Sequence, residues 1–284
     1  MLTANENYIK YVENDLKNHK GLLHPIDANI LFRIKTLEIS PKKLHPNPED
    51  EFSMDKFGPN WEIVSNYEND IRLREPHGLT LFDEPIIVVK LDKGGYMLLN
   101  GHHRWMAALN VGVKKVPVKV VNCIHEDDIS KRIQSSDRDK CVTIDFDEVL
   151  FSDTFQAANN KVKFPFNHIY KKNIRENTSY IVRELQRIGY DVWIYTGSYL
   201  SEKYLTGLFA INNCKVDGIV NGLNGKRNSK KMKEEFRSKY KQIIHVSNEM
   251  ITCVDTATRD YQSIDINVPD GQWAAAVVEN VNKL

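Results

Sequence analysis

Apolar runs with strand character alternate with helical patterns throughout the second half of the chain. The strand-like runs are CVTIDFD, DVWIYTGS, KVDGIVNG, QIIHVS and MITCVD, and helical spacing covers residues 178–189, 202–212 and 229–240 before a closing helix from Gln272. Strands that alternate with helices build units whose strands lie parallel in one sheet. Residues 140–284 are therefore predicted to form an open parallel α/β sheet.

The first half of the chain has a different order of patterns. These are a leading helix near 5–19, a short strand over 37–44, the loop HPNPEDEF, a helix over 61–74, the paired strands PIIVVKL and YMLLN, a helix over 102–111 and the strand VPVKVVNC. We predict a helical extension over residues 1–35 and an α+β domain over 36–124. The polar stretch over 125–139 predicts a linker or linking helix.

The composition excludes several classes of protein. With 41% apolar and 27% charged residues, a chain of 284 residues is predicted to be folded and not membrane-spanning, and its start lacks the apolar core of a secretion signal. The net charge is +1, so any binding to a polyanion has to be local. The cysteines Cys123, Cys141, Cys214 and Cys253 lie far apart, which favours reduced buried thiols in a cytoplasmic protein.

The sequence NGHHR places glycine and three hydrogen-bond donors where an apolar strand meets a helix. These donors are His102, His103 and Arg104, directly after Gly101. A helix N-terminus offers unpaired N–H groups and the positive end of its dipole, so added Arg and imidazole groups favour an anion site suited to phosphates. A surface histidine pair with a salt-bridged arginine is the alternative interpretation.

The order of elements around this box resembles the ParB/sulfiredoxin domain across roughly residues 36–123. Within that superfamily, GHHR is most similar to the free serine kinase branch, whereas ParB partition proteins have a GERR version and sulfiredoxins a GCHR version. The resemblance implies a nucleoside di- or triphosphate (ATP, ADP or CTP) whose phosphates lie on Gly101, His102, His103 and Arg104. The chemistry implied by the kinase branch is phosphoryl transfer.

Two positions bear on this implied site. The kinase-like box usually opens with Asp, whereas this chain has Asn100, so a carboxylate that could hold a metal or a proton is missing. The kinase branch also uses a Glu after the first strand; Glu49 fits that place best, with Asp50 and Glu51 as alternatives. A DNA-clamping partition protein would need a basic helical region after about residue 125, where this chain continues into its α/β pattern.

Two carboxylates, Asp145 and Asp147, follow the apolar strand of VTIDFDEVL. Because strand side chains alternate, both are predicted to project to the same side, where Mg²⁺ between them would relieve their repulsion. The motif resembles the first motif of the haloacid dehalogenase-like (HAD) phosphohydrolases. That resemblance implies that Asp145 attacks phosphorus to give an aspartyl phosphate, while Asp147 protonates the leaving oxygen and later activates water.

The other HAD motifs are matched less completely. The strand DVWIYTGS ends in Thr196, whose hydroxyl could bind a phosphoryl oxygen. The implied charge-neutralising lysine is assigned to Lys230, with Lys226 and Lys231 as alternatives. Where paired acids should ligate the metal, the chain has Ser247, Asn248 and Glu249. Either Glu249 or Asp255 is then the metal ligand, or the metal is weakly held and hydrolysis is slow.

These observations predict a bifunctional phosphate enzyme. A nucleotide-dependent, kinase-like first domain precedes a Mg²⁺-dependent phosphomonoester hydrolase with at most a small cap. Its expected partners are a nucleotide and either a small phosphorylated substrate or a phosphorylated nucleic-acid end, with no membrane. The alternative is a non-catalytic, nucleotide-gated regulatory or DNA-associated ParB-like binding protein. Trp105, Trp193 and the segment FPFNHIY are either core residues or platforms on which a base could stack.

Overall fold

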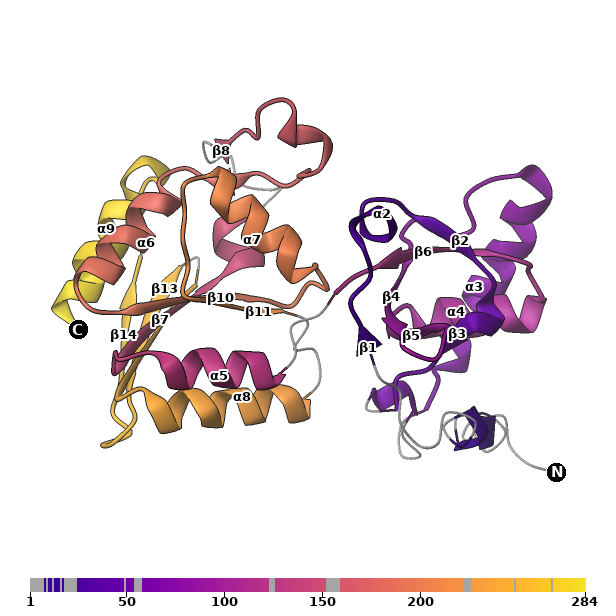
Figure 1. Ribbon diagram of the computed structural model, residues 1–284, viewed down its shortest axis with the longest axis horizontal. Coiled ribbons are helices and arrows are strands. Elements are labelled where there is room, and N and C mark those ends of the chain that lie inside the picture. Colours follow the sequence, from indigo (N-terminus) through magenta and orange to yellow (C-terminus); the bar gives the residue numbers. More distant parts are fainter. Residues whose placement is uncertain are drawn as a thin grey trace. The chain divides into compact units, whose positions relative to one another are not determined.

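The computed structural model divides the chain into two compact units, Met1–Asn122 and Cys123–Leu284, and each is described by itself (Figure 1). The described residues are 8, 10, 11, 13–15, 17, 25–48, 50–53, 58–122, 126–151, 159–221, 226–247, 249–266 and 268–284. Glu49, Cys123 and Asn248 lie outside them. None of the helices in this described part combines the length and the apolar character that a membrane crossing requires.

The first unit is built on a mixed sheet with the strand order β2-β6-β4-β5-β3, and β1 pairs with β4. The strands are β1 (Pro25–Ile26), β2 (Leu37–Ile39), β3 (Leu44–His45), β4 (Ile86–Leu91), β5 (Tyr96–Asn100) and β6 (Val116–Val120). The predicted pairing of β4 with β5 is confirmed and is antiparallel. The single strand expected over 37–44 is instead two short strands, because Pro41 begins the 3-10 turn η1 (Pro41–Lys43) between them.

The helices of the first unit are α2 (Ile30–Arg33), α3 (Trp61–Arg74) and α4 (His102–Val111), with the 3-10 turns η2 (Glu51–Ser53) and η3 (Glu75–His77). The predicted bounds of α3 and α4 are confirmed. The Asn60 side chain caps α3 by accepting from the backbone N–H groups of Glu62 and Ile63. The α4 helix buries Trp105 completely in the core of this unit.

The second unit contains a sheet with the order β11-β10-β7-β12-β13-β14. Its strands are β7 (Lys140–Asp145), β10 (Asp191–Thr196), β11 (Gly218–Asn221), β12 (Gln242–Val246), β13 (Met250–Asp255) and β14 (Tyr261–Asp265). The first four in this order are parallel, as predicted. The prediction of a wholly parallel sheet is wrong, because β13 turns back antiparallel to β12, and β14, which the sequence patterns did not reveal, pairs with β13.

Helices cover both faces of this sheet. Figure 1 shows α5 (Glu126–Ser135) and α8 (Lys226–Lys239) on one face and α6 (Thr178–Arg187), α7 (Glu202–Ile211) and α9 (Asp270–Lys283) on the other. Successive residues of a strand point to opposite faces. In β10, accordingly, Val192 and Ile194 lie in the core under α6, α7 and α9, whereas Trp193 packs with residues of α5 and α8.

The segment expected to be a linker or linking helix contains α5, which belongs to the second unit. Ile129 and Ile133 of α5 are buried against Met232 and Phe236 of α8. The Ser130 hydroxyl donates to the Glu235 carboxylate at 2.6 Å. Although the segment is polar overall, its few apolar residues recur at helical spacing, which is sufficient to bury one face.

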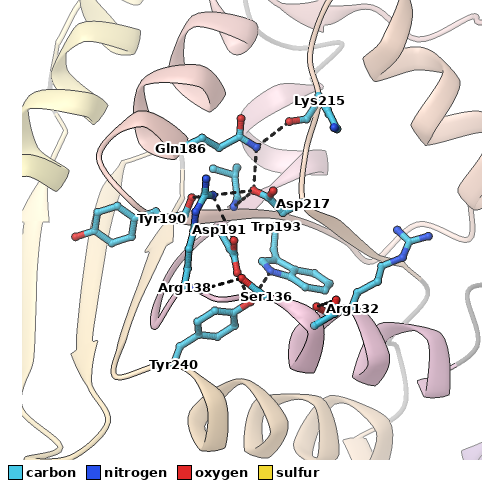
Figure 2. Close-up of polar contacts among 12 residues, drawn as sticks. Arg132, Ser136, Arg138, Gln186, Tyr190, Asp191, Trp193, Lys215, Asp217 and Tyr240 are labelled. Carbon is cyan, nitrogen blue, oxygen red and sulfur yellow. Dashed lines mark hydrogen bonds and ion pairs between the residues drawn. The ribbon is translucent and has the colours of Figure 1, made fainter.

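A polar network closes the amino-terminal end of this sheet (Figure 2). The Arg138 guanidinium donates to the Tyr190 carbonyl at 2.6 Å and to Asp191 Oδ1 at 3.3 Å. The Tyr240 hydroxyl donates to Asp191 Oδ2 at 2.8 Å and accepts from the Trp193 indole at 3.1 Å. Asp191 is buried, so these donors compensate its carboxylate for the loss of water.

Residues 159–175, which precede α6, extend away from the sheet. They contain the short pair β8 (Asn159–Asn160) and β9 (Ile174–Arg175), which are antiparallel, with the 3-10 turn η5 (Phe166–His168) between them. Figure 1 shows this segment projecting past α7. The thiols of Cys141, Cys214 and Cys253 are free and buried, as predicted, and burial raises the pKa of Cys214 to about 12.

Candidate functional site

The first candidate site begins where β5 ends at Gly101. This residue is the N-cap of α4 and has φ 94°, a left-handed conformation that favours glycine. A Cβ at this position would lie 3.1 Å from Arg104 Nε and 3.3 Å from Ile86 Cγ1. The first N–H groups of α4 have no intrahelical partner, as at any helix start, and the N-cap Gly101 offers no side-chain acceptor, so these groups suit an anion.

The His102 imidazole is buried beneath this helix start. Its Nδ1 lies 3.9 Å from the Asp50 carboxylate, and its Nε2 has no hydrogen-bond partner among the described residues. Burial lowers the pKa of His102 to about 4, although the nearby Asp50 carboxylate opposes that effect. His102 is therefore neutral at physiological pH and adds no positive charge to the site.

The His103 imidazole is half-buried and has a defined acceptor atom. Its Nε2 accepts the Asn60 backbone N–H at 3.1 Å, so the neutral ring carries its proton on Nδ1. Burial also lowers the pKa of His103. The Phe52 ring lies edge-on to His103 at 4.8 Å between centroids and packs against His102 at 5.1 Å. One aromatic ring thus positions both imidazoles.

Arg104 points into the protein, contrary to its expected contact with phosphate. Its guanidinium donates to the Glu84 carbonyl at 2.6 Å and to Asn100 Oδ1 at 2.9 Å, and the side chain is buried. The Asn100 amide oxygen therefore orients Arg104. The first candidate site consequently consists of helix N–H groups and neutral imidazoles, without an exposed guanidinium.

Of the three acidic candidates, Asp50 is the one whose described carboxylate lies near the GHHR sequence, 3.9 Å from His102 Nδ1. Glu49, which the sequence favoured, lies outside the described residues, and the Glu51 side chain is exposed. Asp50 Oδ1 accepts the Phe52 backbone N–H at 2.9 Å, which fixes the loop beneath both imidazoles. Sequence reasoning named Asp50 as an alternative and missed Phe52, although an aromatic residue after an acidic loop is a usable signal.

The second candidate site lies where β7 ends at Asp145. The following residues, Phe146–Leu150, form a single turn of π-helix, η4. The Asp145 carboxylate caps this turn by accepting the Glu148 backbone N–H at 2.7 Å. The expected alternation of Asp145 and Asp147 along one strand is therefore wrong, because the strand stops at the first carboxylate and the π-turn positions the second.

The Asp147 carboxylate is bound by the turn that follows β10. Its Oδ2 accepts from the Thr196 hydroxyl at 2.6 Å and from the Gly197 and Ser198 N–H groups at 2.9 and 3.3 Å. Its Oδ1 accepts from the Ser198 hydroxyl at 2.8 Å. Asp147 and Thr196 are thus brought together, and the donors expected to bind a phosphoryl oxygen here bind a carboxylate of the protein.

A histidine not predicted from the sequence lies near Asp145. His245 of β12 is paired in register with Thr143 of β7, and its Nδ1 lies 2.9 Å from the Thr143 hydroxyl. Burial lowers the pKa of His245, and the carboxylates of Asp145 and Glu148 oppose this effect. A single histidine within an apolar strand does not by itself indicate a functional site. His245 could be placed near Asp145 only once the structure showed that β12 lies beside β7.

Lys230 is 80% exposed and pairs with Glu234 on the same helix at 3.9 Å. The charge of Lys233, one turn further along α8, contributes to the lowered pKa of His245. The side chains of Lys226 and Lys231 lie outside the described part. Among the described lysines of α8, Lys233 is therefore better placed near this site than Lys230.

The two predicted metal ligands lie at opposite ends of the sheet. Glu249 follows β12 in the turn beside the end of β7, and its side chain is exposed. Asp255 pairs in register with Gln242 at the start of β12, and its carboxylate accepts the N–H groups of Ala257 and Thr258, each at 2.9 Å. Asp255 therefore shapes a turn and does not share a metal with Asp145.

The described residues do not fit a magnesium site. Within the described ranges, no group of three or more His, Cys, Asp or Glu side chains could hold a metal ion. Mg²⁺ prefers about six oxygen ligands in octahedral geometry. Asp147 already accepts four hydrogen bonds from the β10 turn.

Comparisons with known proteins bear on the first candidate site. Residues 33–136 match the family model of the ParB N-terminal domain. An ATP-dependent L-serine kinase of Staphylothermus marinus is 35% identical over 102 residues, which cover 35% of this chain and 38% of the kinase. The chain thus aligns with well under half of that relative's length. The family match also extends past the first unit into α5.

Solved structures give weaker likenesses. The ParB protein of Caulobacter crescentus complexed with CTP-γ-S is 25% identical, with 37% of this chain and 56% of that chain covered and a TM-score of 0.26. A free serine kinase in complex with AMP is 11% identical, with 91% and 85% covered and a TM-score of 0.24. Because both scores are low, these structures carry no argument. The likeness that is shown is the match of residues 33–136 to the ParB N-terminal domain, together with the partial identity to the serine kinase.

Proposed function

We propose that the first unit binds a nucleoside phosphate and transfers a phosphoryl group to the hydroxyl of a small acceptor such as a free hydroxyamino acid. The arrangement of Asp50 and His102 at the start of α4 is the observation that carries this proposal. It places a carboxylate, neutral imidazoles and helix N–H groups together. The 35% sequence identity to an ATP-dependent L-serine kinase over 102 residues supports a hydroxyamino acid as the phosphoryl acceptor.

The proposed residues divide the chemistry between them. The N–H groups after Gly101 and the Nδ1–H of His103 would hold phosphate oxygens, since both are donors. The acceptor hydroxyl oxygen attacks the terminal phosphorus, the bond from that phosphorus to the bridging oxygen of the nucleotide breaks, and Asp50 takes the hydroxyl proton. The products are a phosphate monoester and a nucleotide shortened by one phosphate.

The test supplies ATP, ADP or CTP with serine, threonine and other hydroxy compounds, in buffers with and without Mg²⁺, and detects products by mass spectrometry. Asp50→Asn is expected to lower the rate of product formation at least about a hundredfold, the range for loss of a general base. Asp70→Asn, at an exposed position of α3, is the matched control. Equal rates for the Asp50→Asn variant and the wild type would exclude Asp50 as the base.

Nucleotide binding without product formation would favour the alternative of a non-catalytic, ParB-like regulator. Isothermal titration with each nucleotide separates the two functions. In both cases His103→Gln is expected to weaken binding, because it removes the Nδ1–H donor. His77→Gln, at an exposed position in η3, should bind as the wild type does.

We propose as a second function that the second unit hydrolyses phosphomonoesters. Its support is the junction of Asp145 with the donor-rich turn that holds Asp147. An Asp145 oxygen would attack phosphorus and release the alcohol, which takes up a proton, and water would then cleave the aspartyl phosphate. When an anionic ester binds, a phosphoryl oxygen would replace the Asp147 carboxylate as the acceptor of the hydrogen bonds from Thr196 and Ser198.

Release of phosphate from an aryl phosphate tests this second function. Asp145→Asn is expected to abolish release, and Asp137→Asn, at an exposed position before β7, is expected to retain it. Since the described residues do not fit Mg²⁺, the assay is run with added Mg²⁺ and with chelator. Equal release by the Asp145→Asn variant and the wild type would exclude Asp145 as the nucleophile.

A further inference from the structure

The loop over residues 161–172, between β8 and β9, is strongly basic. From Asn159 to Arg175 the chain has five Lys or Arg residues and no Asp or Glu. Lys161, Lys163 and Lys171 have exposed side chains. In a protein whose net charge is only +1, this loop is a local positive patch of the kind that a polyanion requires.

Exposed apolar side chains alternate with these charges. Phe164 is 77% exposed and Phe166 is 48% exposed, whereas Trp105 and Trp193 are 0% and 1% exposed. Of the aromatic candidates that the sequence offered for stacking on a base, the two tryptophans therefore belong to the core and the loop phenylalanines face solvent. Exposed rings cost free energy in water unless a partner covers them.

The base of this loop contacts the turn that contains Asp145 and Asp147. The Lys172 ammonium lies 3.3 Å from the Phe151 ring centroid, and the rings of Phe151 and Phe146 stack at 5.9 Å. Phe146 is the residue between the two aspartates. The Tyr204 hydroxyl of α7 also accepts the Lys171 and Lys172 backbone N–H groups at 3.1 and 3.3 Å. The loop is thus anchored at the edge of the second candidate site.

We propose that the 161–172 loop binds single-stranded nucleic acid and presents its terminal phosphate to the Asp145 turn. The phenylalanine rings stack on unpaired bases, and the lysines contact backbone phosphates. This combination distinguishes a single strand, because bases in a duplex are already stacked on each other. The inference names the substrate class of the second proposed function and rests on it, but strand binding itself needs no hydrolysis.

The test measures binding of the full chain to a short labelled oligothymidylate by fluorescence anisotropy. The oligothymidylate carries no terminal phosphate, so that binding is measured apart from hydrolysis. The double variant Phe164→Ala/Phe166→Ala is expected to bind at least about tenfold more weakly, since each base stacked on an aromatic ring contributes about 1–3 kcal/mol. The control Tyr180→Ala/Tyr261→Ala removes exposed rings of the same unit, 41% and 61% exposed, and is expected to bind as the wild type does.

Charge is tested separately through the salt dependence of binding. Lys161→Gln/Lys163→Gln is expected to reduce the slope of log affinity against log salt by about 1.4, or about 0.7 for each lost phosphate contact. Lys131→Gln/Lys283→Gln removes the same charge from exposed ion pairs and is expected to keep the wild-type slope. Unchanged melting midpoints confirm that all four variants are folded.

Equal affinity of the wild type and the Phe164→Ala/Phe166→Ala variant would overturn the proposal, as would binding of duplex as tight as binding of single strand. Oligouridylate in place of oligothymidylate distinguishes RNA from DNA as the source of the strand. Phosphate release from a phosphorylated strand is measured apart from binding. Strand binding without release would leave the docking surface supported and contradict only the hydrolase function.

Discussion

The Thr196 hydroxyl donates to Asp147 Oδ2 at 2.6 Å and thereby connects the ends of two neighbouring strands. Thr196 is the last residue of β10, and Asp147 lies in the π-turn directly after β7. The Thr196 side chain is buried, so this hydrogen bond is shielded from water. The position of Asp147 relative to Asp145 therefore depends on β10 as well as on its own strand.

Replacing Thr196 by Val removes this donor and keeps the shape of the side chain. We expect a loss of about 1 kcal/mol in the free energy of unfolding, the typical contribution of one hydrogen bond. We also expect at least about a tenfold loss of aryl phosphate hydrolysis, because an oxyanion donor is lost. Urea denaturation and phosphate release measure the two effects. Thr206→Val, at an exposed position in α7, should change neither quantity.

Replacing Arg138 by Met leaves the buried Asp191 carboxylate without its cationic partner. We expect the free energy of unfolding to fall by about 3 kcal/mol, the cost of breaking a buried ion pair from one side. Arg187→Met breaks an exposed pair with Glu184 and should cost less than about 1 kcal/mol. Equal losses in the two variants would show that the network in Figure 2 contributes no more than a surface pair.

The His102 imidazole makes the stability of the first unit depend on pH. Its pKa is lowered by burial to about 4 in the folded protein, so the unfolded chain takes up this proton first as pH falls. The contribution is fully present above about pH 6.5 and is lost between about pH 6.5 and 4, about 3 kcal/mol in total. Urea midpoints of the wild type should therefore fall more steeply over this range than those of His102→Gln.

The same experiment has a control among the exposed histidines. His77→Gln should follow the wild-type pH dependence, because the His77 side chain is exposed in η3. The groups that face His102 are Asp50 and His103, and both are unchanged in these variants. Parallel pH profiles for wild type and His102→Gln would contradict a neutral buried His102.

Gly218 has no room for a side chain. A Cβ there would lie 2.1 Å from the Trp193 ring, which is buried and donates to Tyr240. We expect Gly218→Ala to lower the free energy of unfolding by about 1–3 kcal/mol or more, the cost of overpacking a core. Gly271→Ala, where a Cβ would meet nothing within 4 Å, should not destabilise the protein. Urea denaturation compares the two variants.

Much of the secondary structure could be predicted because it depends on local patterns. The helical spacing over 61–74 and 102–111 corresponds to α3 and α4. The apolar runs of the second half correspond to the four parallel strands β7, β10, β11 and β12 and to the antiparallel strand β13. The short strand β14 escaped prediction because YQSID lacks an apolar alternation and is stabilised by pairing with β13.

The sequence by itself determined that Gly101 precedes a helix and that an apolar strand leads to Asp145, because both depend on neighbours in the chain. Only the tertiary structure decided that Arg104 points inward, that Asp255 lies at the far end of the sheet, and that the charge of Lys233 acts on His245. These outcomes depend on strand register and helix facing. Both are set by packing between residues far apart in the chain, which local periodicity does not encode.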